Sequence, residues 1–163
     1  MIPVMSVEEL KAIIERHPDR GSLPVECVLA FCMAESSFHT YAIKFEPQYR
    51  WLYGDQKTMS ISERLGQMHS WGLMQVMGGV AREHGFVGDF TQLWEPEIGL
   101  RYGMRHLRRY YARHQKWPET IASYNAGSPV VVDGKFKNQA YVDKVLKFWN
   151  ACEQQIPLKH TEV

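Results

Sequence analysis

One side chain, Glu35, stands in a sequence context that suits proton transfer. It follows an apolar stretch, residues 24–33, that predicts a buried helix. At about 100° per residue, Val28 and Phe31 fall on the same side of that helix as Glu35. Burial disfavours the charged form of a carboxyl group and raises its pKa, and a proton donor that works near neutral pH needs a raised pKa. The alternative is a glutamate that bends into solvent, which helical geometry alone favours because charged side chains are seldom buried unpaired.

The elements that must position Glu35 are predicted to be mainly helical. Capping signals, apolar periodicity and boundary prolines or glycines predict helices over residues 6–16, 24–33, 60–69, 95–114, 118–127 and 139–154, and a further helix that stops at residue 85. Alternating aromatic residues predict an extended or irregular segment over residues 39–59. The remaining pieces are a short extended stretch at 71–77 that enters a helix, a loop at 128–137 and a loose polar tail at 157–163.

Composition limits the classes of protein that fit. The 163 residues suffice for one domain, and we expect a single domain over residues 1–163 because no repeat, low-complexity tract or linker interrupts the chain. A net charge of +1 gives no global field that would attract nucleic acid or an acidic membrane. Cys27, Cys32 and Cys152 form neither a disulfide framework nor a CxxC motif, so we expect buried, reduced thiols.

Several familiar signals are missing from the sequence. No P-loop, GxGxxG, GxSxG or HExxH motif occurs, so no cofactor is expected. Glu35 and His39 are four residues apart, but the predicted helix ends between them, and we expect no metal site. The first six residues lack the basic and apolar regions of a secretory signal, and no apolar run is long enough to span a bilayer. We therefore expect no membrane insertion.

The predicted helix at 95–114 carries a row of arginines beside its apolar stripe: Arg101, Arg105, Arg108, Arg109 and Arg113. Such a row could bind the phosphate backbone of a nucleic acid. Because the net charge is nearly balanced, a solvated helix face is the favoured interpretation.

Two polar motifs are harder to explain as core or surface. Gly-Leu-Met-Gln at residues 72–75 puts an amide beside a glycine at a predicted strand-to-helix junction, where backbone can approach a ligand. Tyr-Asn-Ala-Gly at residues 124–127 ends a helix with two polar side chains and a glycine. Amides suit acetamido groups and hydroxyls, and exposed aromatics suit sugar faces. The aromatic candidates are Tyr41, Tyr49, Trp51 and Trp71, although each could equally belong to the core.

In order along the chain, Glu35-Ser36, the two motifs above and Tyr-Val-Asp-Lys-Val at 141–145 resemble the soluble lytic transglycosylase family. That family belongs with the goose-type lysozymes to the lysozyme-like superfamily, and the resemblance spans about residues 24–149. It implies a mainly α, lysozyme-like (goose-type/transglycosylase) fold with a small extended β region lining the cleft. It also implies peptidoglycan glycan strands as substrate and partner.

The resemblance further implies roles for individual residues. Glu35 would be the single acid/base: it protonates the bridging oxygen of the MurNAc–GlcNAc bond and then takes the proton of the MurNAc C6 hydroxyl, which closes a 1,6-anhydro ring. The substrate's N-acetyl group would replace a protein nucleophile. Tyr141 would orient Glu35, and Ser36 would support it. The residues implied to contact sugar are Leu73, Met74, Gln75, Tyr124 and Asn125.

The sequence leaves the reaction type open. An inverting hydrolase needs a second carboxylate, and goose-type lysozymes often carry an Asp two places after the Gln of their Gly-Leu-Met-Gln motif. Met77 occupies that place here, which favours the anhydro-forming reaction. Glu46, Asp55 and Asp89 remain candidate bases, and Glu46 is also a candidate to face the cleft.

A goose-type muramidase is therefore the first alternative. A non-catalytic glycan-binding module and a nucleic-acid-binding helical domain are the others. Departures from the family pattern at residues 68–71 and at Gly78 leave the shape of the cleft wall open. We expect a monomer that acts on the bacterial cell wall in the periplasm, reached by phage lysis, virion delivery or a dedicated export route.

Overall fold

The computed structural model of the protein describes residues 4–158. Within that range the α-helices are α1 (Val7–Arg16), α2 (Val25–Ser36), α3 (Ile61–Gln67), α4 (Gly78–Glu83), α5 (Pro96–His114), α6 (Trp117–Ala126) and α7 (Gln139–Glu153). Two short 3-10 helices are η1 (Pro18–Arg20) and η2 (Phe90–Trp94). The strands are β1 (Ile43–Phe45), β2 (His69–Trp71), β3 (Val76–Met77), β4 (Val131–Val132) and β5 (Lys135–Phe136). The prediction of a mainly α protein with a small extended region is confirmed.

Helix boundaries follow the local sequence signals closely. Ser6 and Glu9 exchange hydrogen bonds in a complete capping box at the start of α1. The second predicted box is half-formed: the Ser60 hydroxyl accepts from the Glu63 amide, but the Glu63 carboxylate pairs with Arg82 instead of returning to the cap. Helix α6 ends where Gly127 adopts a φ of 77°, a left-handed conformation that glycine adopts without steric cost.

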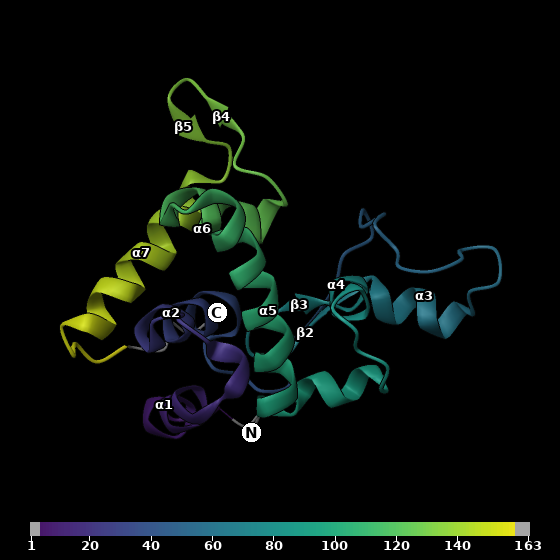
Figure 1. Cartoon of the computed structure of the whole chain (residues 1–163), viewed down its shortest axis with the longest axis horizontal. Coiled ribbons are helices and arrows are strands. Elements are labelled where there is room, and N and C mark those ends of the chain that lie inside the picture. The colour runs from purple at the N-terminus through teal and green to yellow at the C-terminus, as the bar shows by residue number, and fades with distance from the viewer. Residues whose placement is uncertain (1–3, 159–163) are drawn as a thin grey trace.

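Two predicted segments differ from the structure. The stretch at 71–77 does enter a helix, because β3 is followed directly by α4, but it is not one extended piece: β2 and β3 pair antiparallel, and residues 72–75 form the turn between them. In that turn Gly72 and Gln75 both have positive φ, 67° and 46°. Residues 128–137 are not a loop but contain the β4–β5 hairpin, which projects from the molecule (Figure 1). The predicted loose tail lies mostly outside the described residues, and residues 157–158 form no regular element.

Helix α2 lies in the main core and is apolar on nearly every face. Its buried residues include Val28, Phe31, Cys32 and Met33, and it packs against α1 and α7. A helix that is apolar all round must be covered on all sides. All three cysteines are free thiols, and Cys27 and Cys32 are buried as expected, whereas Cys152 is only half-buried.

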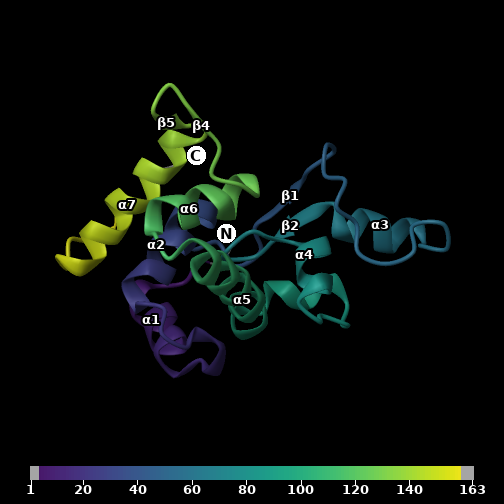
Figure 2. The same ribbon diagram turned by 45° about the horizontal axis from the view of Figure 1, so that its top comes forward.

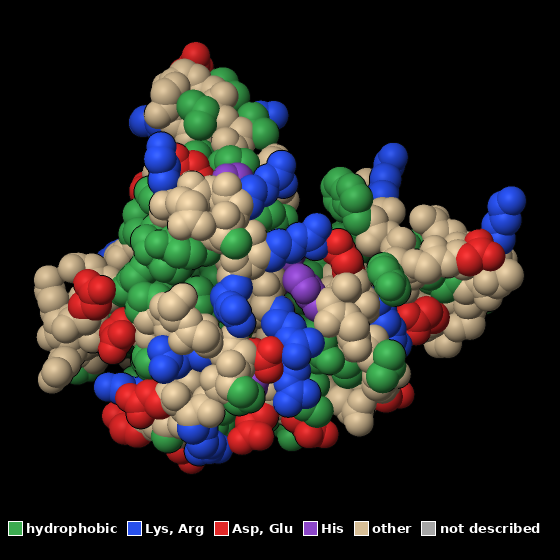
Figure 3. Space-filling model, in the orientation of Figure 1, with side chains coloured by type: hydrophobic (Ala, Val, Ile, Leu, Met, Phe, Trp, Pro, Cys, Tyr) green, Lys and Arg blue, Asp and Glu red, His purple; other side chains and the backbone are tan. Residues whose placement is uncertain are grey.

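Helix α5 separates two packed parts of the molecule (Figures 1 and 2). One part, the helical lobe, contains α1, α2, α6 and α7, and Leu100, Met104 and Leu107 of α5 complete its core. The other, the sheet lobe, contains β1–β3, α3, α4 and η2 around a second apolar cluster that includes Tyr102. In the space-filling view the surface is hollowed between the β4–β5 hairpin, beside the helical lobe, and α3 and α4 of the sheet lobe (Figure 3).

The three-stranded sheet has the order β1-β2-β3, with Ile43 opposite Trp71 and Lys44 opposite Ser70. The C-terminal end of α2 meets this sheet lobe directly, because the Ser36 hydroxyl donates to the Leu73 carbonyl at 2.8 Å. The last turn of α2 therefore lies where the two lobes join.

Candidate active site

The Glu35 side chain lies on the last turn of α2 and is partly buried. Its Oε1 accepts a hydrogen bond from the Tyr141 hydroxyl of α7. Burial raises the pKa of Glu35 to about 7, while the Tyr141 hydroxyl and the Lys144 ammonium group oppose that rise. Glu35 therefore does not bend into solvent, and near neutral pH it is populated in both protonation states.

Tyr141 is held as a hydrogen-bond donor. Burial, together with the nearby charge of Glu35, raises the pKa of the Tyr141 phenol well above its usual value. Because the phenol keeps its proton, the bond to Glu35 runs from the Tyr141 hydroxyl to the carboxyl oxygen. Helix α7 packs closely on α2, so this contact joins residues 106 positions apart in sequence.

Ser36 is buried and does not bond the Glu35 carboxyl. Its hydroxyl lies 3.0 Å from the Cys32 carbonyl and 2.8 Å from the Leu73 carbonyl. The first acceptor belongs to α2 and the second to the 72–75 turn. Ser36 therefore links the helix end that carries Glu35 to that turn.

The side chains of Leu73 and Met74 do not line a cleft, contrary to the prediction. They are 1% and 0% exposed and belong to the main core. Gly103 of α5 leaves the room that Met74 fills, since a Cβ at that position would lie 2.5 Å from the Met74 sulfur. The Met74 carbonyl accepts a hydrogen bond from the Tyr124 hydroxyl at 2.8 Å. The sequence motif alone could not distinguish a backbone role from side-chain contact.

The two predicted amides have different surroundings. The Gln75 side chain is half-buried and turns back on its own turn, accepting from the Ser70 hydroxyl and donating to the Gly72 carbonyl, both at 2.9 Å. Asn125 is exposed, and its Oδ1 accepts from Asn138 at 2.9 Å. No partner for the Asn125 amide nitrogen occurs among residues 4–158. Asn125 thus retains donors for a ligand, whereas Gln75 is occupied in this conformation.

Tyr124 is 9% exposed and serves the core rather than an open surface. Its ring meets Phe31 edge-on, with centroids 4.8 Å apart. Together with its bond to Met74, this contact holds α6 against both α2 and the 72–75 turn. The charge of Glu35 contributes to raising the pKa of the Tyr124 phenol, second to burial, so the two groups are neighbours.

Glu46 follows β1 and forms an ion pair with Lys44, whose Nζ lies 2.7 Å from the Glu46 Oε1. Both charges affect the pKa of Glu35: Lys44 lowers it and Glu46 raises it. The end of β1 therefore lies within electrostatic range of the Glu35 carboxyl. The other two candidate bases cap exposed turns, with Asp55 accepting from the Lys57 amide and Asp89 from Thr91.

The aromatic candidates divide into surface and core. Trp51 and Tyr41 are exposed, at 76% and 53%, and Tyr49 is half-buried. Trp71 is core, the second of the two alternatives that the sequence left open, and it stacks on Phe90 in the sheet lobe. Phe45 and Tyr53, which were not among the candidates, are also exposed.

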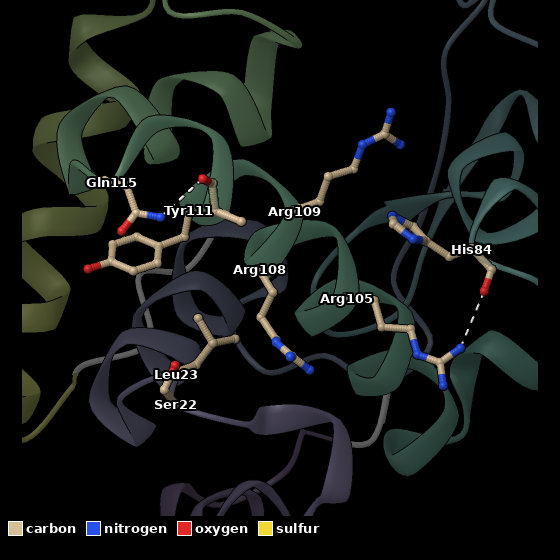
Figure 4. Close-up of a pocket in the computed structure, with 9 residues that line it drawn as sticks. Ser22, Leu23, His84, Arg105, Arg108, Arg109, Tyr111 and Gln115 are labelled. Atoms are coloured by element: carbon tan, nitrogen blue, oxygen red, sulfur yellow. Dashed lines mark hydrogen bonds between the residues drawn. The ribbon is translucent and has the colours of Figure 1, made fainter.

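Three arginines of α5, Arg105, Arg108 and Arg109, border a different hollow, shown in Figure 4, which Glu35 does not line. Asp19 pairs with Arg101 and Arg105, and Glu83 pairs with Arg109 at 2.7 Å. The lining residues are Ser22, Leu23, His84, Arg105, Arg108, Arg109, Tyr111, Ala112 and Gln115. Because much of the positive charge is paired within the protein, this face fits a solvated, ion-paired helix surface better than a phosphate-binding one.

In the described part of the chain no three histidine, cysteine or acidic side chains gather as a metal site. Among the same residues no helix has the length and apolarity needed to cross a bilayer.

The sequence profile of the Transglycosylase SLT domain family matches residues 12–146. The chain belongs to this family. The match begins within α1, ends within α7 and includes Glu35, the 72–75 turn and Tyr141. Membership establishes a lysozyme-like fold and, at the level of the family, a transglycosylase-type action on peptidoglycan. A comparison of this SLT domain with curated proteins gave no match.

Proposed function

We propose that this SLT domain is a lytic transglycosylase that cleaves the β-1,4 MurNAc–GlcNAc bond and leaves a 1,6-anhydroMurNAc end, with Glu35 as its single acid/base. The observation that carries the proposal is the Glu35 carboxyl itself, which is partly buried, accepts from Tyr141 and has a pKa raised to about 7 by burial. One group that must give a proton and then take one needs both forms to be accessible near neutral pH.

In the first step protonated Glu35 gives its proton to the bridging glycosidic oxygen. The bond between that oxygen and the MurNAc C1 breaks, and the GlcNAc hydroxyl leaves with the proton. Positive charge develops at C1, where the substrate's own N-acetyl oxygen stabilises it in place of a protein carboxylate. The hydrogen bond from Tyr141 strengthens as Glu35 becomes negative, which stabilises the transition state more than the ground state.

In the second step the Glu35 carboxylate takes the proton of the MurNAc C6 hydroxyl. The C6 oxygen bonds to C1 and closes the anhydro ring, the acetamido group returns to its original state, and Glu35 is again protonated. No water is consumed, so the enzyme is ready for another cycle without a second catalytic group.

The remaining site residues support this reaction in different ways. Tyr141 and Ser36 are proposed to position Glu35, one through its carboxyl and the other through the helix end. The exposed Asn125 is the best-placed amide for a sugar acetamido group, because its amide hydrogens are free. Gln75 would join it only if its bond to Ser70 opens. Tyr124 is proposed to shape the cleft floor rather than to offer its hydroxyl.

A goose-type muramidase, which hydrolyses the same bond, is the second candidate. Glu46 favours it, because its charge affects the pKa of Glu35 and a second carboxylate could activate water. The ion pair of Glu46 with Lys44 weighs against it, since this carboxylate already has a partner within the protein. A non-catalytic glycan-binding module would bind wall fragments without turnover.

The test combines one substitution with product analysis. Glu35→Gln keeps the size of the side chain and removes its acid, so turnover of purified peptidoglycan should fall by at least roughly 10²–10⁴-fold. Wild-type digestion in heavy-oxygen water separates the two reactions: hydrolysis places the label at the new reducing end, and the anhydro-forming reaction incorporates none. Retained turnover in Glu35→Gln would refute the role of Glu35.

We also propose that the substrate is met in the periplasm, through phage lysis, virion delivery or a dedicated export route, and that the domain acts as a monomer. The family's action on the bacterial wall supports the proposed site of action.

A further inference from the structure

The last turn of α2 is fastened by a lysine as well as by Tyr141 and Ser36. The four carbonyls at the end of a helix lack partners within it and need donors from elsewhere. Here Lys144 of α7 donates from Nζ to the Ala34 carbonyl at 2.7 Å. Ala34 directly precedes Glu35, so α7 holds the side chain of Glu35 through Tyr141 and the adjoining backbone through Lys144.

The backbone beyond this turn bends sharply. Ser37 and Phe38 both have positive φ, 49° and 64°, in the left-handed region that non-glycine residues rarely adopt. The helix therefore stops within two residues of Glu35. A cation at a helix C-terminus is favourably placed against the negative end of the helix dipole, so Lys144 stabilises the turn at the point where it ends.

Charged and titratable groups surround the Glu35 carboxyl on several elements. Lys144 and Tyr141 come from α7, Lys44 and Glu46 from the β1 segment, Tyr124 from α6 and Cys32 from α2 itself. The charge of Lys44 is balanced by Glu46 at 2.7 Å. Lys144 takes part in none of the ion pairs formed by residues 4–158. Near Glu35, the positive charge of Lys144 is therefore not paired with a carboxylate until Glu35 itself ionises.

We propose that Lys144 is a positioning residue of the reaction, which fixes the last turn of α2 through the Ala34 carbonyl and stabilises the carboxylate that Glu35 becomes after the first proton transfer. The inference rests on the proposed function of Glu35. A negative charge in a partly buried site is costly unless it is compensated. Tyr141 supplies a hydrogen bond, and Lys144 supplies the opposite charge. Without Lys144, Glu35 holds its proton more tightly and is a weaker acid.

The test measures the Glu35 carboxyl directly. Protein labelled with ¹³C at glutamate carboxyls is titrated by NMR, and the Glu35 signal is identified by its loss in Glu35→Gln. In Lys144→Met we expect the pKa of Glu35 to rise by about 1 unit, the lower end of what a nearby opposite charge produces. Lys144→Arg keeps the charge and a donor, so it should restore the wild-type value.

Lys147→Met is the matched control, because Lys147 is exposed on the same helix and forms no hydrogen bond or ion pair with α2 among the described residues. It should leave the pKa of Glu35 at the wild-type value. The alkaline limb of the kcat profile on peptidoglycan should move upward in Lys144→Met with the measured pKa, and stay in place in Lys147→Met.

An equal pKa of Glu35 in Lys144→Met and Lys147→Met overturns the proposal, as does a shift that Lys144→Arg fails to reverse. The titration needs no substrate, so it tests Lys144 independently of the proposed function. The proposed function itself fails if the wild-type protein does not turn over peptidoglycan.

Discussion

Replacing Tyr141 with Phe removes one hydroxyl from the site and leaves the ring that packs between α7 and α2 in place. The hydroxyl donates to Glu35 and lowers the pKa of that carboxyl against the effect of burial. A hydrogen bond to a charged group contributes about 1.5–3 kcal/mol net, and one pKa unit corresponds to about 1.4 kcal/mol. Tyr141→Phe should therefore raise the pKa of Glu35 from about 7 by about 1–2 units.

The same free energy sets the expected loss of rate. If the bond reaches full strength when Glu35 has given up its proton, its removal lowers kcat by about 10–100-fold. The reaction requires protonated Glu35, so activity falls as the pH rises through the pKa of Glu35. This fall is the alkaline limb of the pH profile, and a higher pKa of Glu35 moves it to higher pH. Tyr141→Phe should thus show a lower plateau together with an upward shift of the limb.

The assay is the rate of clearing of purified cell walls across a pH series, beside the NMR titration of the Glu35 carboxyl. Tyr111→Phe is the control, because Tyr111 stacks on Trp117 with ring centroids 4.3 Å apart and does not contact Glu35. A plateau that falls while both the limb and the pKa of Glu35 stay in place would mean a structural effect. A rate within twofold of wild type would refute the reasoning.

Three further substitutions test the surroundings of Glu35. The pKa of Glu35 is raised from 4.5 to about 7 in the folded protein, so its contribution to the free energy of unfolding is fully present below pH 4.5 and is lost as the pH rises through 7. This loss is about 3 kcal/mol, and Glu35→Gln should abolish it. Urea unfolding near pH 4 and pH 9 measures the difference. Ser36→Ala leaves the buried Leu73 carbonyl without its 2.8 Å partner and should cost about 1–3 kcal/mol and lower kcat, whereas no change in either would contradict the linking role of Ser36. Gly103→Ala puts a Cβ 2.5 Å from the Met74 sulfur and 2.7 Å from its Cβ, so a loss of about 1–3 kcal/mol is expected in the same assay, and unchanged stability would mean that Met74 repacks freely.

Local signals in the sequence predicted most helix boundaries because each depends on a few neighbouring residues. Proline at the start of α5, at Pro96, and Gly127 after α6 are examples. The β4–β5 hairpin was missed although its turn residues, Asp133 and Gly134, have the positive φ values of a two-residue hairpin turn and form a recognised sequence signal. The 72–75 turn was harder to predict, because Gln75 adopts a left-handed conformation that glutamine rarely takes.

The site was predictable only in part, for a similar reason. Helical periodicity placed Glu35 on an apolar face, and local sequence suffices for that inference. The partner of Glu35 lies 106 residues away, and spacing alone cannot bring Tyr141 to it. Lys144 sits at an exposed helix position, and its role depends on the reach of a long side chain to the end of another helix. Burial of Leu73 and Met74 likewise follows from how α5 packs.

The products of wild-type digestion provide the most direct test of the central claim, that one carboxyl group both gives and takes the proton. Purified peptidoglycan is digested in heavy-oxygen water, and the released muropeptides are weighed by mass spectrometry, with Glu35→Gln as the blank. We predict anhydro ends, one water lighter than hydrolysis products and free of label. Labelled reducing ends in their place would contradict the account and make a second carboxylate, with Glu46 tested first, a required part of the site.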